Sequence, residues 1–227
     1  MSKFRVSYNA PVVLTFALLA VAVHCLTYVG GDSVRLWFAS WPKLHDARSY
    51  VGLVSHILGH ANWQHLMGNF MLILLLGPIL EERFGSFQLL VMIVLTALIT
   101  GLIYLVIGTT FLQGASGIVF MMIILASTAN IRQGEIPLTF IAVALVYMGG
   151  EIVQAVNQGD GDNVAHLAHL IGGTAGGVFG FLGAKAHLLG NKGRSLDLAA
   201  AKALDKPQAA KASAGAAKAA ASAKKPA

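Results

Sequence analysis

The chain has 227 residues, of which 56% are apolar and only 11% are charged, against about 25% charged residues in an ordinary soluble domain. This composition excludes a typical soluble enzyme, and the high hydrophobicity excludes disorder over most of the length. The net charge of +6 does not indicate a nucleic-acid partner, because the basic residues lie at the ends of apolar runs and in the C-terminal part. The single cysteine, Cys25, excludes an internal disulfide and a multi-thiolate metal site.

Six apolar segments predict an all-α polytopic membrane protein with six transmembrane helices. They span about residues 11–29, 66–81, 87–107, 115–129, 136–156 and 164–189. A bilayer core of about 30 Å needs about 20 helical residues, and the first and third segments meet that length alone. The second and fourth segments are shorter, so we expect them to lie in a bundle with their polar ends toward protein or a water-filled cavity. No cleavage site follows the first segment, which should therefore remain as an anchor.

The distribution of basic residues predicts the orientation and the division of the chain. With both termini in the cytoplasm, 13 of the 16 Lys and Arg residues lie inside, as the positive-inside rule requires. We expect residues 1–9 to form a cytoplasmic N-terminus, 10–190 a six-helix domain and 191–227 a flexible Ala/Lys-rich cytoplasmic tail. Residues 30–64 should form an external loop, whose tryptophans suit a structure in the membrane interface.

A first group of polar residues precedes and enters the second segment. It consists of His56, His60, His65 and Asn69, spaced by four, five and four residues. His65 and Asn69 share one helical face, and His56 and His60 would do so if the loop before them were helical. A lone histidine here is more often a hydrogen-bonded structural residue, and zinc binding is the competing interpretation for the group. Because there is no H-E-x-x-H motif and no carboxylate among these residues, we expect neither a metal nor a cofactor.

Ser116 lies in a G-x-S-G sequence at the expected external start of the fourth segment. The free N–H groups of a helix N-terminus would point at an anion there, which suits a nucleophile whose attack creates an oxyanion. Alone, the pattern is weak, because a serine among Gly and Ala is an ordinary helix-packing residue.

The sixth segment carries His166 and His169 near its expected external end, followed by glycines four residues apart. That spacing puts small residues on one face and lets another helix approach closely; alone, it is explained as well by a packing or dimer seam. His169 shares a stripe with Gly172 and Gly176, so we expect it to face the fourth segment and His166 to meet water or the first loop. Close packing there would bring a histidine base to Ser116.

Together these motifs resemble the rhomboid family of intramembrane serine proteases over about residues 50–185. The similar motifs are H-x-x-x-H-x-x-x-x-H-x-x-x-N from His56 to Asn69, E-x-R-x-G from Glu81 to Gly85, G-x-S-G around Ser116 and A-H-x-x-G-x-x-x-G from Ala168 to Gly176. The resemblance implies a rhomboid-like six-helix bundle, with Glu81 and Arg83 structural at the internal turn. Val51-Gly52 stands where some members have Trp-Arg, and Phe120 stands where Tyr is frequent, although its ring can still stack on an imidazole.

The resemblance also implies an activity, the cleavage of transmembrane protein substrates near the external membrane face by a serine endopeptidase. It implies Ser116 as the nucleophile and His169 as the general base of a dyad. The oxyanion would be bound by His65, Asn69 and the Ser116 backbone N–H, with His60 supporting the site. No acid partner is expected.

Asp162 or Asn163 is interpreted as the N-cap of the sixth segment. Two other functions stay open, a catalytically inactive relative that binds transmembrane clients and a small transporter whose polar residues line a pathway. Glu151, within the fifth segment, is compatible with the transporter; otherwise it should lie near the external helix end and face the loop or the headgroups. The expected location is a bacterial inner membrane.

Overall fold

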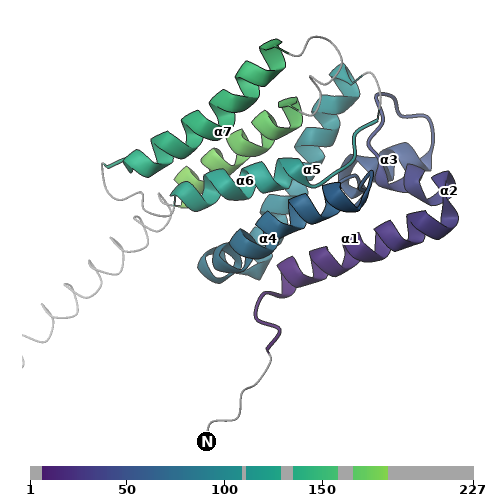
Figure 1. Ribbon diagram of the computed structural model, residues 1–227, viewed down its shortest axis with the longest axis horizontal. Coiled ribbons are helices and arrows are strands. Elements are labelled where there is room, and N and C mark those ends of the chain that lie inside the picture. Colours follow the sequence, from purple (N-terminus) through teal and green to yellow (C-terminus); the bar gives the residue numbers. More distant parts are fainter. Residues whose placement is uncertain (1–6, 109–110, 129–134, 158–165, 184–227) are drawn as a thin grey trace, which may run out of the picture. The chain divides into compact units, whose positions relative to one another are not determined.

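The computed structural model describes residues 7–108, 111–128, 135–157 and 166–183, and these residues form helices joined by loops. The predicted segments become α1 (Pro11–Gly30), α4 (Trp63–Phe84), α5 (Ser86–Ile107), α6 (Ser116–Ser127), α7 (Leu138–Asn157) and a helix over residues 166–183 (Figure 1). Within the described residues the only β pairing is an isolated bridge between Ser40 and Leu112, so the all-α class is confirmed there. The expected tail, 191–227, lies outside the described residues.

Three of these helices are long and apolar enough to cross a membrane. They are α1, α4 and α5, with mean hydropathies of 2.3, 1.4 and 2.8. The 12 residues of α6 extend over about 18 Å at 1.5 Å per residue, which does not span a hydrocarbon core of about 30 Å. In α7, which has 20 residues, the stretch Leu138–Val153 is apolar. The helix lengths therefore do not establish that the chain crosses the membrane six times, and that count stays a prediction.

One buried carboxylate fastens the turn between α4 and α5 to the start of α1. The two oxygens of Glu81 accept the backbone N–H groups of Val12 and Val13, each at 3.0 Å. The Ser86 hydroxyl donates to the same carboxylate at 2.7 Å. An anion at a helix N-terminus satisfies free N–H groups and is favoured by the helix dipole, so Glu81 has a structural role, as the resemblance implied.

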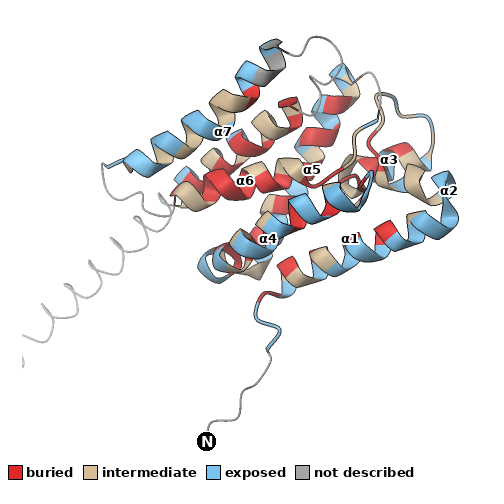
Figure 2. Ribbon diagram, in the orientation of Figure 1, coloured by how far each residue is buried: buried red, intermediate tan, exposed pale blue. Residues whose placement is uncertain are grey.

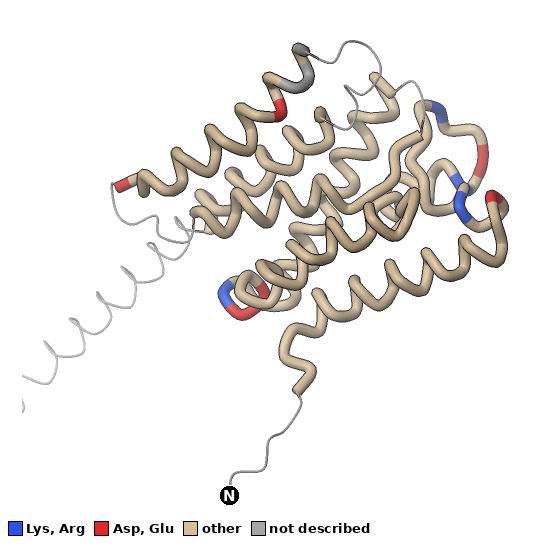
Figure 3. The backbone as a smooth tube through the Cα atoms, viewed as in Figure 1, with Lys and Arg blue, Asp and Glu red and all other residues tan. Residues whose placement is uncertain are grey.

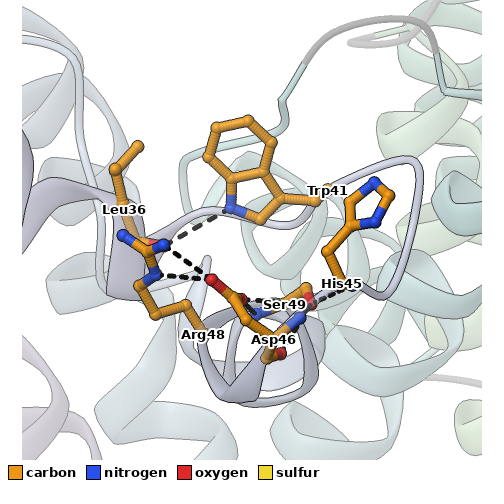
Figure 4. Close-up of polar contacts among 6 residues, drawn as sticks. All are labelled: Leu36, Trp41, His45, Asp46, Arg48 and Ser49. Carbon is orange, nitrogen blue, oxygen red and sulfur yellow. Dashed lines mark hydrogen bonds and ion pairs between the residues drawn. The ribbon is translucent and has the colours of Figure 1, made fainter.

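The first loop has a folded framework of its own. It contains α2 (Asp32–Arg35), the 3-10 turn η1 (Leu36–Phe38) and α3 (Ala47–Ser55). A capping box begins α3: the Asp46 carboxylate accepts the Ser49 N–H at 3.1 Å, and the Ser49 hydroxyl accepts the Asp46 N–H at 3.1 Å (Figure 4). Arg48 donates to the same carboxylate at 2.8 Å, so the start of α3 is well defined.

The helix α6 lies at the centre of the described helices. Most of its side chains are buried, and it is red along most of its length in Figure 2. It packs against α4 and α5, and residues 166–183 lie between it and α7. By contrast, α1 exposes large apolar side chains such as Leu18, Leu26 and Val29. An apolar outer surface of this kind is what a lipid environment requires.

Charged side chains gather at the helix ends and in the first loop of the described residues (Figure 3). The exception is Glu151, the one acidic residue within α7. An ionisable group inside an apolar helix is costly unless it finds a partner. Its surroundings are therefore part of the site described next.

Candidate active site

Ser116 is the first residue of α6, as the sequence predicted. The chain reaches it through residues 111–115, where Gly114 adopts a φ of 126°, a conformation that residues with a side chain rarely adopt. No described side chain caps this helix N-terminus. The N–H groups of the first turn can therefore bind an oxyanion that forms at the half-buried Ser116.

The segment before Ser116 is held by hydrogen bonds to the first loop, which we call the loop brace. Ser40 and Leu112 exchange two backbone N–H···O bonds of 2.9 Å each. The Gln113 side-chain amide donates to the Phe38 carbonyl at 3.2 Å and accepts from the Arg35 guanidinium at 3.1 Å. The position of the serine thus depends on a part of the chain about 75 residues earlier.

His65 and Asn69 of α4 lie beside Gly114, two residues before the serine. A Cβ placed on Gly114 would lie 2.7 Å from His65 Cε1, 2.8 Å from its Nε2 and 3.7 Å from Asn69 Nδ2. The two side chains share a helical face, as their spacing predicted. Asn69 is buried, and its Nδ2 has no hydrogen-bond partner among the described atoms. Because a buried donor is costly when unpaired, this amide is suited to an acceptor that arrives with a substrate.

His60 supports His65 from behind. It is buried, the two imidazole centroids are 5.1 Å apart in an edge-to-face arrangement, and His60 Nδ1 donates to the Leu58 carbonyl at 3.2 Å. Burial lowers the pKa of His60 to about 4. The ring is therefore neutral at pH 7 and packs against His65 without adding a charge.

His56 holds the loop before the serine. Its backbone carbonyl accepts the Gly114 N–H at 3.0 Å, and its ring Nδ1 donates to the Gly52 carbonyl at 3.1 Å. Burial lowers the pKa of His56 to about 4. The helix α3 ends at Ser55, so the condition under which His56 and His60 would share a helical face is not met. Each supports the site from a loop instead.

Residues 166–183 pack directly on α6, as the glycine spacing predicted. A Cβ added to Gly172 would fall on the backbone carbonyl of Gly117, and one added to Gly117 would lie 3.2 Å from the Ala168 carbonyl oxygen. Ala168 and Gly172 flank His169, and Gly117 follows Ser116. Only small residues allow two backbones to come this close, so the helix that carries the histidine touches the one that carries the serine.

The imidazole of His169 is stacked on Phe120. The two rings are parallel to within 4°, with centroids 4.4 Å apart, and Phe120 lies one helical turn after Ser116. Tyr147 of α7 contacts the Phe120 ring edge-on at 6.0 Å. The stacking that the sequence predicted for this phenylalanine is confirmed, and it fixes the plane of the imidazole.

Glu151 contacts both histidines of the 166–183 helix, which the sequence did not predict. One carboxylate oxygen is hydrogen-bonded to His166 Nδ1 at 2.6 Å, and the other lies 3.0 Å from His169 Nδ1. Both Glu151 and His166 are buried. The expectations that Glu151 faces the loop or headgroups and that His166 meets water or the first loop are therefore wrong, because each residue stabilises the other's polar group inside the bundle. The expected N-cap, Asp162 or Asn163, lies outside the described residues.

This arrangement brings to one end of the bundle the groups that an acyl-transfer site would need. A serine at a helix N-terminus, a histidine on the adjoining helix and side-chain donors beside the serine are the groups that such chemistry uses. Ser116 also lines a cavity of about 10 Å³ with Thr100 and Ala168, which is about the space of one water molecule.

Comparisons with known proteins agree with these motifs. The profile described as "Rhomboid domain" matches residues 47–186. A protein named Rhomboid protease GlpG from Serratia proteamaculans is 27% identical over 178 residues, which cover 77% of this chain and 63% of that protein. A protein of the same name from Haemophilus influenzae is 24% identical over 187 residues, which cover 81% and 96%. The chain thus spans less than two thirds of the first relative and nearly all of the second.

Proposed function

Since the chain belongs to the rhomboid family, we propose that it is an intramembrane serine endopeptidase that cleaves transmembrane proteins near the external membrane face. The observation that carries this proposal is the packing of the His169 helix on the residue after Ser116, where Gly172 lies against Gly117. This packing supports the assignment of His169 as the general base for Ser116, because it brings their two helices into contact. A Ser–His mechanism requires both groups in adjoining positions.

In the proposed reaction, Ser116 Oγ attacks the scissile carbonyl carbon while His169 Nε2 takes the hydroxyl proton. The carbonyl π electrons move to the oxygen, and the tetrahedral intermediate collapses as the C–N bond breaks and His169 returns the proton to the leaving amine. Water then attacks the acyl-enzyme by the same route and releases the serine. His169 Nδ1 faces Glu151, which leaves Nε2 for these transfers.

We assign the oxyanion to the Ser116 backbone N–H and to the side chains of His65 and Asn69. The geometry at Gly114 supports this assignment, since both side chains lie beside the loop that leads to the serine. One donor of this kind contributes about 10²- to 10³-fold to kcat. His60 then acts through His65, by fixing the position of its ring.

The substrate segment must be unwound at the site. Carbonyl groups inside a helix are hydrogen-bonded and shielded by the helix, so a peptide bond becomes open to attack only where the helix ends or breaks. We therefore expect small or helix-breaking residues at the cleavage point of the substrate.

Fluorophosphonate labelling tests the proposed nucleophile. In detergent, the wild-type chain should be labelled and should cleave a model transmembrane substrate, while Ser116→Ala should lose both and stay folded because little packing is lost. Ser127→Ala is the matched control, since that hydroxyl donates to the Ile124 carbonyl at the other end of α6. Undiminished cleavage by Ser116→Ala would remove the serine mechanism, and a folded wild type that binds clients without being labelled would favour an inactive relative.

We propose in addition that the chain lies in a bacterial inner membrane with six crossings over residues 10–190 and both termini, including the 191–227 tail, in the cytoplasm. The basic-residue distribution supports this orientation. So does the clustering of site residues at the starts of α4, α6 and the 166–183 helix, which places three alternate segments in the same direction. Periplasmic reporters fused at Gly31 and Asp160 should be active and one at the C-terminus silent. An active C-terminal fusion contradicts this topology.

A further inference from the structure

Glu151 is a carboxylate with 8% exposure in an otherwise uncharged helix, and each of its oxygens contacts a different imidazole. The distances are 3.0 Å to His169 Nδ1 and 2.6 Å to His166 Nδ1. A buried ionised carboxylate is unfavourable unless nearby groups compensate its charge. Both compensating groups are histidines on one helix, and one of them is the proposed base.

We propose that Glu151 is the positioning residue of the general base, a role that rests on the proposed serine mechanism. Its carboxylate keeps Nδ1 of His169 directed at α7 and compensates the positive charge that the ring acquires during attack. In the proposed step the Ser116 O–H bond breaks and an N–H bond forms at His169 Nε2, and no proton passes to Glu151. In a poorly solvated site such a fixed charge is worth far more than in water.

Two contacts together define the direction of His169 Nε2. The Phe120 stack fixes the ring plane but leaves the ring free to turn within that plane. The Glu151 contact at Nδ1 removes this second freedom. His166 holds the other carboxylate oxygen, so that the carboxylate itself cannot turn away from the base.

The same three side chains are the described group whose ligand atoms, all within 4.8 Å of one another, could hold a metal ion. A tetrahedral zinc with bonds of about 2.1 Å would separate its donors by about 3.4 Å. The separation of 2.6 Å between Glu151 and His166 is shorter. Direct contact between carboxylate and imidazoles is therefore the arrangement that this geometry favours.

The test compares Glu151→Gln with Glu81→Gln in the full chain in detergent. Both carboxylates are buried, with exposures of 8% and 4%. Glu81, however, accepts hydrogen bonds from the first turn of α1 and from Ser86 at the start of α5. Glu151→Gln should lower kcat and the rate of Ser116 labelling about 10- to 1000-fold with KM changed less than about threefold, because the lost interaction grows in the transition state. Glu81→Gln should lower the unfolding temperature while kcat of the folded protein stays within about twofold. Glu151→Asp, which keeps the charge at a longer distance, should lie between wild type and Glu151→Gln.

Several results would overturn the inference. They are a kcat of Glu151→Gln within about twofold of wild type, a loss confined to KM, and a wild-type activity that a metal chelator abolishes. If Glu151→Gln does not fold, Glu151→Asp decides, since wild-type kcat in that variant is incompatible with a positioning role. The two kinetic results leave the proposed function untouched, which fails instead if Ser116→Ala still cleaves or the wild type is never labelled.

Discussion

Adding one methyl group to Gly172 should inactivate the protein without altering a reacting group. A Cβ there would lie 2.7 Å from the Gly117 carbonyl carbon, whereas ordinary van der Waals contact is 3.4–4 Å. The obstacle is backbone in the first turn of α6 and cannot rotate aside, so the helix carrying His169 must retreat by about 1 Å. A misplacement of about 1 Å costs about 100-fold in rate. We therefore expect Gly172→Ala to lower both substrate cleavage and fluorophosphonate labelling of Ser116 about 100-fold.

Gly177→Ala on the same helix is the matched control. Its added Cβ would meet only Ile124 Cγ2, at an ordinary 3.8 Å, and both variants gain the same helix propensity. Thermal unfolding should show a loss of about 1–3 kcal/mol for Gly172→Ala through overpacking and wild-type or higher stability for Gly177→Ala. Equal cleavage rates in the two variants would refute the argument that this backbone contact sets the distance between serine and base.

Asn69→Ala should lower kcat about 10- to 1000-fold if its buried amide donates to the oxyanion; unchanged kcat would assign that amide to structure alone. In the same assay His169→Ala should lose nearly all activity while His166→Ala retains more, because His169 is the histidine that stacks on Phe120, one helical turn after the proposed nucleophile Ser116; the reverse order would exchange their roles. Acid should destabilise the fold, because burial lowers the pKa of His56 from 6.5 to about 4. The contribution of neutral His56 to the free energy of unfolding is therefore complete above pH 6.5. It is lost as the pH falls toward 4, because in this range the unfolded chain binds a proton at His56 and the folded chain does not. Thermal unfolding of His56→Gln should show a shallower loss over this range, and an unchanged slope contradicts the assignment.

The parts of the site that depend on local periodicity could be predicted from the sequence. The spacing of His65 and Asn69 places both on one face of α4 wherever that helix lies. The glycines after His169 marked the face on which another helix could approach, and the structure puts α6 there. The third segment, predicted over 87–107, is α5 at Ser86–Ile107, because an uncharged run of that length has few alternatives to a helix in lipid.

Contacts that depend on the rotation or register of distant segments could not be predicted. The partners of Glu151 depend on the rotation of α7 about its own axis. A helix that is apolar over most of its circumference has no separate apolar stripe from which its buried face could be predicted. The bridge between Ser40 and Leu112 uses backbone groups that every residue carries. No side-chain pattern marks such a pairing across about 70 residues of sequence.

Because of the loop brace, the candidate active site and the helix bundle should lose their structure at different temperatures. The bonds from Arg35, Phe38 and Ser40 join the first loop, with its short helical turns, to residues 112–113 before α6, whereas the long helices are held by a continuous buried core. Loops open with smaller free energies than packed helices. Warming should therefore release the segment before Ser116 while the helices are still intact, so half of the cleavage activity should be lost at a lower temperature than half of the helical signal. The temperature at which cleavage activity is lost would then be set by the few hydrogen bonds of the loop brace. Strengthening these bonds should raise that temperature without any change to the buried core.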